Sequence, residues 1–179
     1  MKQSSFAGGS TVGLAMSYLR VPPVLEGERD PGAIARLIFG VADWRRRQPA
    51  PQVLDLGRGW QALHYLITGD PWDGRPPAAD VVCGGRLLTE DGAGELGLDV
   101  IYLAPDRVKP AADHLASTPY GGLAGRYDPA AMASAGVQDA AALKPGADQF
   151  RPAYEGLARF FQAAADEGQA VYKVMAEQS

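Results

Sequence analysis

The chain has 179 residues, of which 46% are hydrophobic and 21% charged, as in an ordinary globular protein, and its formal net charge is -4. This acidic balance gives no basic surface for nucleic acid, and no apolar run reaches the roughly 18 residues that a membrane-spanning helix needs. A single cysteine, Cys83, excludes an internal disulfide.

We expect a flexible leader at residues 1–13 and a single domain at residues 14–179. The leader is rich in Ser, Gly and Thr and lacks the apolar segment of a secretory signal, which together with the absence of disulfides points to the cytoplasm. The chain has 22 glycines and 14 prolines, which divide it into short elements without a repeat or a linker. We therefore predict an α+β fold in which a small mixed sheet packs with about five helices.

The first half of the domain is predicted to hold a strand and two helices. The strand covers residues 14–21 and ends at two prolines. The first helix begins at the cap-and-proline pair Asp30-Pro31. Its inward face is predicted from apolar residues at helical spacing, namely Ile34, Leu37, Ile38 and Val41. The second helix covers residues 58–68 and ends at Gly69, a typical left-handed C-terminal cap. Its apolar stripe is predicted to consist of Leu56, Trp60, Leu63 and Ile67.

Two short strands and a helix are predicted next. Apolar runs at residues 81–83 and 100–103 are typical of strands, and a Gly-rich turn separates them. A helix is expected over residues 106–116. It contains Pro110, which is compatible with a helix only if the first turn starts near Lys109.

The last part of the domain is predicted to hold two helices and a strand. Asp128-Pro129 repeats the cap-and-proline pattern and opens a short helix. Residues 152–167 have the most regular helical pattern, and Gly168 stops it. Residues 170–175 alternate like a terminal strand.

Residues 53–59, V-L-D-L-G-R-G, match the opening of the cofactor loop in S-adenosylmethionine-dependent methyltransferases. In those enzymes the glycines let the backbone approach the cofactor at a helix N-terminus. The rest of the pattern is missing, because Gln61 stands where a further glycine is expected and Trp60 adds bulk to the loop. The helix also ends early, at Gly69, before a Pro-rich segment. We predict no cofactor.

Side chains suited to catalysis or metal binding are few. His64 lies beside the apolar stripe and is predicted to be buried, with a hydrogen-bonded ring nitrogen; the alternative is a general base oriented by Asp55 or Asp70. His114 lies in a separate helix, so neither histidine has the neighbours that a zinc site needs. Cys83 follows two valines and is expected to be a small buried hydrophobic residue. We therefore expect no metal and assign no catalytic residue.

A candidate groove is assigned to the polar residues of two segments. These residues are His64, Tyr65, Asp70, Arg126 and Tyr127. Arg126 is expected to pair with Asp55 or Asp70, because a guanidinium can hold a carboxylate through two hydrogen bonds. The alternative is that it points into a cleft and holds an anionic ligand.

Several segments of the chain resemble the YfbM-like family, a bacterial family described as a domain of unknown function. The most specific segments are L-D-L at 54–56, the tryptophan at 60, L-H-Y-L at 63–66 and T-G-D at 68–70. Further similar segments are Y-L-R-V-P at 18–22, V-C-G-G at 82–85 and R-Y-D-P-A-A-M at 126–132. Together they cover most of the chain from Tyr18 to Met175.

The resemblance implies a small α+β fold and a cytoplasmic bacterial protein, and it implies no reaction. The chain departs from the family at two places. The family usually carries an acidic residue and a lysine where Gly57 and Arg58 stand. It also tends to have G-P-A-R before the position of Leu103, where this chain has D-V-I at 99–101.

Three hypotheses of function follow from the sequence. The first is a non-enzymatic cytoplasmic binding or accessory protein, of an immunity or stress-associated type, whose partner is a protein or a small polar ligand. It depends on the acidic composition and on the lack of a recognised catalytic pattern. The second is an enzyme that acts on a small polar substrate in a groove near His64 and Arg126. The third is a methyltransferase. The sequence makes no prediction of the oligomeric state.

Overall fold

One antiparallel sheet forms the centre of the structure, a computed structural model that describes residues 13–23, 31–89 and 96–178. Its strands lie in the order β2-β1-β5-β4-β3, and every described pairing is antiparallel. The strands are β1 (Gly13–Val21), β2 (Val53–Gly57), β3 (Arg86–Leu87), β4 (Leu98–Leu103) and β5 (Ala170–Gln178). The predicted α+β class is confirmed, and the sheet is antiparallel where a mixed one was expected.

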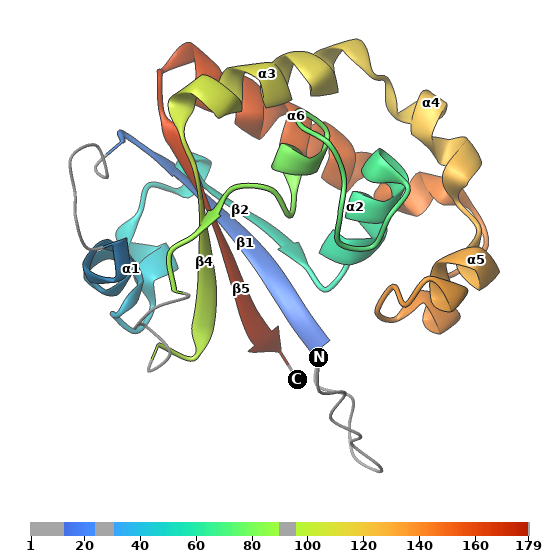
Figure 1. Ribbon diagram of the computed structural model, residues 1–179, viewed down its shortest axis with the longest axis horizontal. Coiled ribbons are helices and arrows are strands. Elements are labelled where there is room, and N and C mark those ends of the chain that lie inside the picture. The colour runs from blue at the N-terminus through green and yellow to red at the C-terminus, as the bar shows by residue number, and fades with distance from the viewer. Residues whose placement is uncertain (1–12, 24–30, 90–95, 179) are drawn as a thin grey trace.

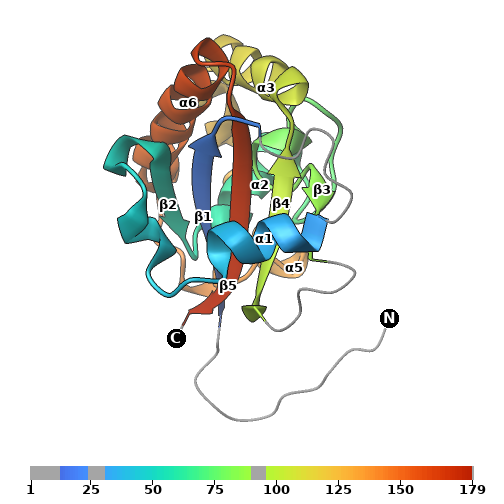
Figure 2. The ribbon, with the colours of Figure 1, turned by 90° about the vertical axis from the view of Figure 1, so that its left-hand side faces the viewer.

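Helices pack on both faces of the sheet (Figure 1). They are α1 (Pro31–Phe39), α2 (Trp60–Thr68), α3 (Pro105–Ser117), α4 (Tyr120–Leu123), α5 (Pro129–Ser134) and α6 (Arg151–Asp166). Helix α1 crosses one face, whereas α2, α3 and α6 pack on the other and bury the larger part of the core (Figure 2). None of the helices in the described ranges is both long enough and apolar enough to cross a membrane.

Strand β5 lies at the centre of the sheet, and both of its faces are covered. Because successive side chains of a strand point to opposite faces, Val171, Lys173 and Met175 face α2, α3 and α6, while Tyr172 and Val174 face α1. All five side chains are buried. A lysine in the middle of such a strand is unusual, because burying its charged group without partners is costly.

The ends of three predicted elements have the expected geometry. Gly69 adopts the left-handed conformation at the end of α2, with φ of 84°, and Gly168 follows α6 with φ of 64°. Asp128 caps α5, since its Oδ1 accepts hydrogen bonds from the backbone N–H groups of Ala130 and Ala131, both at 3.1 Å. These predictions are confirmed. The leader up to residue 12 and the expected cap Asp30 lie outside the described residues.

Three apolar residues were assigned to the wrong face or element, and one of them, Val41, lies beyond the end of α1 at Phe39. Leu37 is 74% exposed, because the face of α1 that meets the sheet is centred on Ile34, Ala35 and Phe39. Leu56 belongs to β2 and not to the stripe of α2. The other predicted members of the α2 stripe are buried in the core, as expected: Trp60, Leu63 and Ile67.

Residues 81–83 do not form the predicted strand. Val81 is the last residue of a short 3-10 helix, Ala79–Val81, and the next two residues form a turn. The backbone here pairs with side chains instead of a strand: Tyr18 Oη donates to the Val81 carbonyl at 2.8 Å, and Lys173 Nζ donates to the carbonyl of Asp80. The apolar residues of this segment therefore face the core although their backbone does not pair with a strand of the sheet.

Helix α3 starts earlier than predicted, at Pro105, so Pro110 lies inside it. The expectation that the helix could begin only near Lys109 was wrong. The N–H that Pro110 lacks would have paired with the carbonyl of Asp106 in the preceding turn. Both Asp106 and Pro110 are exposed, so water can bind this carbonyl and the helix continues.

Candidate functional site

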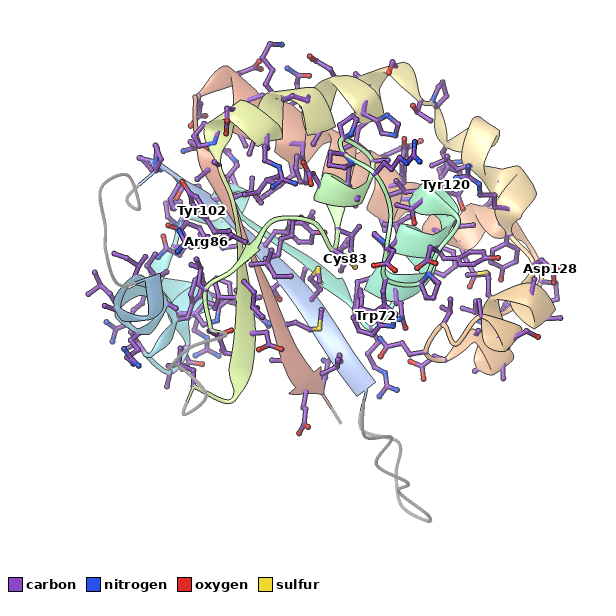
Figure 3. All side chains as sticks on the ribbon, in the orientation of Figure 1. Trp72, Cys83, Arg86, Tyr102, Tyr120 and Asp128 are labelled. Carbon is purple, nitrogen blue, oxygen red and sulfur yellow. The ribbon has the colours of Figure 1, made fainter. Side chains whose placement is uncertain are left out.

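The described residues form a groove on the face of the sheet that carries α2, α3 and α6. A cavity of about 340 Å³ lies there, lined by Leu14, Trp72, Cys83, Gly85, Leu87, Asp99, Ile101 and Met175. We name it the Trp72 groove. Figure 3 shows Trp72 at the foot of α2 and Cys83 close to it, both over the sheet. A second cavity of about 350 Å³ continues from it and shares Leu14, Asp99 and Met175.

The register of the strands builds the floor of the groove. Met175 of β5 pairs with Asp99 of β4, and two residues further on Glu177 pairs with Leu14 of β1. Alternate residues share a face, so these side chains lie on the same side as Lys173. The floor therefore changes along β5 from a buried lysine through an apolar residue to a carboxylate.

The apolar end of the groove carries two exposed hydrophobic side chains. Trp72 is 51% exposed and Leu87 is 39% exposed. They are two of the three large hydrophobic side chains exposed among the described residues; the third, Leu37, lies on α1 and lines neither cavity. Exposed apolar side chains that gather at one cavity mark a surface suited to binding.

Trp72 is held in place from two sides. Its ring meets the buried ring of Trp60 edge to face, with ring centroids 5.4 Å apart. Trp60 is itself fixed, since its Nε1 donates to the Leu14 carbonyl at 2.8 Å. Asp70 Oδ1 accepts the backbone N–H groups of Trp72 at 2.8 Å and Asp73 at 2.7 Å, and these bonds lower the pKa of the Asp70 carboxyl.

The other wall of the groove is the turn Cys83-Gly84-Gly85, which fits tightly against its surroundings. A Cβ on Gly84 would lie 2.4 Å from Asp80 Oδ1. Gly85 has φ of 130°, and a Cβ there would lie 2.7 Å from the Tyr102 carbonyl oxygen. Both positions therefore require glycine.

Lys173 ties this turn to the sheet from below. Its Nζ donates to the carbonyls of Asp80 and, at 2.6 Å, of Gly84. The Asp80 carboxylate is buried and is held by Arg107, whose Nε lies 2.9 Å from Asp80 Oδ2. Burial lowers the pKa of the Lys173 amine to about 7, and it raises the pKa of the neighbouring Cys83 thiol to about 12.

The far end of the groove carries two carboxylates. Asp99 Oδ1 accepts a hydrogen bond from Thr89 Oγ1 at 3.2 Å, and Glu177 is exposed near the end of β5. Neither forms an ion pair within the described ranges. Arg58, which donates to the Gln178 carbonyl at 3.3 Å, is engaged with the Asp139 carboxylate at 2.8 Å. This end of the groove is therefore acidic.

The structure gives His64 the buried position that was predicted. The ring is fully buried, and its Nε2 lies 3.0 Å from the Asp73 carbonyl oxygen, to which it must donate because a carbonyl only accepts. Nδ1 has no hydrogen-bond partner among the described residues. Burial lowers the pKa of the imidazole, so the ring is neutral at pH 7. The next residue, Tyr65, is partly buried against the core.

Arg126 does not pair with Asp55 or Asp70, and this expectation was wrong. Its Nη1 donates to the carbonyls of Leu66 and Ile67, each at 2.9 Å. The last carbonyls of a helix have no partner within the helix and carry partial negative charge, so the C-terminus of α2 attracts the guanidinium.

The residues assigned to a groove from the sequence line neither of the two cavities described above. Tyr127 donates to the Lys144 carbonyl and accepts from Gln149 Nε2 at 2.5 Å. Any functional role for the predicted groove residues therefore stays a prediction.

The structure brings together residues that sequence reasoning did not connect. The strand pattern predicted for residues 170–175, if continued to residue 177, places Met175 and Glu177 on one face. The position of Trp72 in a Pro-rich loop was a second available signal. The pairing of β5 with β4 could not be predicted from the sequence. Without that pairing, nothing in the sequence places Asp99 in the groove. No group of three or more His, Cys, Asp or Glu side chains in the described part of the chain is arranged to hold a metal ion.

Comparisons with other proteins identify a family and a fold. A family described as "Domain of unknown function (DUF1877)" matches residues 13–173. Among solved structures, a protein of unknown function, YfbM from Escherichia coli, is similar with a TM-score of 0.63 and 13% sequence identity, over 90% of this chain and 99% of that one. At this identity the likeness shows the fold alone. No curated protein matches the chain.

Proposed function

Starting from the fact that this chain belongs to the family of the domain of unknown function DUF1877, we propose that it is a binding or accessory protein and that the Trp72 groove is its binding surface. The proposal places it in the cytoplasm of a bacterium. The groove binds the apolar part of a partner or ligand.

The observation that carries the proposal is the position of Trp72 and Leu87. Both are exposed, and both line the same cavity. Covering apolar surface contributes about 25 cal/mol per Å², and fully burying a side chain of this kind contributes roughly 1.5–3 kcal/mol. Tryptophan is also among the side chains that contribute most to binding at protein surfaces.

The reactive groups near the groove favour binding over catalysis. Cys83 lines the groove, but a thiol with a pKa near 12 is almost entirely protonated at pH 7 and is a poor nucleophile. Lys173 already donates to two carbonyls. His64 and Arg126, on which the enzyme hypothesis depended, are bonded to backbone carbonyls and line neither cavity.

The described strands do not have the arrangement that the methyltransferase hypothesis requires. Its loop requires a strand in a parallel sheet followed by a helix. Here β2 lies at the edge of an antiparallel sheet and pairs with β1 alone among the described strands. We therefore do not propose it.

A neutral fluorescent dye, Nile red, tests the binding surface. Trp72→Ala is expected to weaken dye binding about tenfold, the equivalent of about 1.4 kcal/mol of lost apolar contact, and Leu87→Ser is expected to weaken it as well. Leu37→Ser is the matched control, because it removes the third exposed hydrophobic side chain at a place outside the groove. Equal losses in all three variants, or no loss in Trp72→Ala, would refute the proposal. Thermal melts check that each variant is folded.

A further inference from the structure

The two ends of the Trp72 groove differ in polarity, and the floor strand sets the distance between them. Met175 and Glu177 are two residues apart on β5, so their side chains stand on the same face about 6.7 Å apart. Trp72 and Leu87 lie at the apolar end, and the carboxylates of Asp99 and Glu177 line the continuation of the groove.

The charged groups also differ between the two ends of the groove. Lys173 lies beneath the turn at Cys83, at the apolar end, where a second positive charge would be repelled whenever the amine is protonated. At the other end, neither Asp99 nor Glu177 has an ion-pair partner within the parts of the chain that the structure describes, and Arg58 is engaged with Asp139. A cation is therefore favoured at the acidic end only.

We infer that the groove binds an amphipathic organic cation, a small molecule whose apolar body lies against Trp72 and Met175 and whose ammonium group lies between Asp99 and Glu177. This inference rests on the proposed function and names the class of its ligand. The ammonium donates hydrogen bonds to carboxylate oxygens.

The size of the groove favours a small molecule over a protein segment. A cavity of about 340 Å³ lies at the lower end of the roughly 300–1,000 Å³ of small-molecule sites. An anionic ligand would meet two carboxylates, which makes this class the least favourable.

Three matched compounds test the inference. 3-Phenylpropylamine, 3-phenylpropanol and 4-phenylbutanoate share a phenyl ring and a propyl chain, and they end in a cation, a neutral group and an anion. Affinities are measured by NMR titration from the indole N–H shift of Trp72. We expect the amine to bind about three- to tenfold more tightly than the alcohol, as exposed carboxylates allow, and the carboxylate to bind least. High salt should reduce this preference.

Variants that remove the two carboxylates test where the ammonium group binds. Asp99→Asn combined with Glu177→Gln should make the amine and the alcohol bind equally. Asp106→Asn, which removes a carboxylate exposed on α3, is the control and should keep the preference of the wild-type protein.

The outcomes separate the inference from the proposed function. If the alcohol or the carboxylate binds as tightly as the amine, the inference is refuted while the apolar groove stands. If none of the three compounds shifts the Trp72 signal, the proposed function fails and the inference fails with it. If the peptide acetyl-Phe-Gly-Lys-amide binds more tightly than the amine, the groove belongs to a protein partner and the small-molecule inference is overturned.

Discussion

The burial of Lys173 predicts an unusual dependence of stability on pH. Its amine has a pKa of about 7 in the folded protein against 10.5 when it is free, chiefly because burial disfavours the charged form. Between these values the unfolded chain binds more protons than the folded protein, so the free energy of unfolding rises with pH. From pH 7 to about pH 8.5 the gain amounts to about 1.5–2 kcal/mol.

Two other titratable groups limit the pH range in which Lys173 determines the change in stability. Burial lowers the pKa of His64, so this residue affects the pH dependence of stability below about pH 6.5, its ordinary pKa. Burial raises the pKa of Cys83 from 9.0 to about 12, so the folded protein holds this proton longer than the unfolded chain and stability is lost above pH 9. Lys173 therefore dominates between pH 7 and about pH 8.5.

Thermal melts across this window measure the effect. The gain should raise the melting temperature by roughly 3–8 °C for a domain of this size. Lys173→Met should give a flat profile, and Lys109→Met, which removes an exposed lysine, should keep the slope. A melting temperature that does not rise in the wild-type protein, or a slope that persists in Lys173→Met, would refute the reasoning. The ¹³Cε shift of Lys173 gives the pKa directly in the unaltered protein.

The remaining predictions concern the packing around α2 and α5, and urea unfolding measures each. Trp60→Ala should destabilise the protein by about 3–5 kcal/mol, because the side chain is fully buried, and a loss below about 1 kcal/mol would contradict its place in the core. Arg126→Met should cost roughly 1.5–3 kcal/mol through the lost bonds to the end of α2, with Arg126→Lys retaining part of it. Asp128→Ala should cost about 0.5–2 kcal/mol, while Asp128→Asn, which keeps a capping oxygen, should be nearly neutral.

Elements marked by local chemistry could be predicted from the sequence. Asp128 before a proline identified the start of α5, and glycines after apolar stripes identified the ends of α2 and α6. These signals depend on a few neighbouring residues, so they do not require the fold. The burial of His64 was predicted for the same reason, because it lies beside a helical stripe.

The groove could not be predicted, because it depends on contacts between distant segments. Asp99 and Met175 meet only through the pairing of β4 with β5. The backbone at residues 81–83 has the apolar pattern of a strand, but its neighbouring carbonyls are bonded by Tyr18 and Lys173 from other strands. Arg126 was assigned a carboxylate partner because the free carbonyls at the end of α2 become its neighbours only in the folded chain.

Lys173 connects the stability of the fold with the shape of the groove. A methionine at this position would fill a similar space on β5 without the cost of burying an amine, so core packing alone does not call for a lysine. What the amine adds is its pair of hydrogen bonds to the carbonyls of Asp80 and Gly84. These bonds lie on either side of Cys83 in the chain and fix the wall that faces Trp72. The buried amine that makes stability depend on pH therefore also holds the proposed binding surface in shape, and Lys173→Met should weaken Nile red binding even where the variant is fully folded.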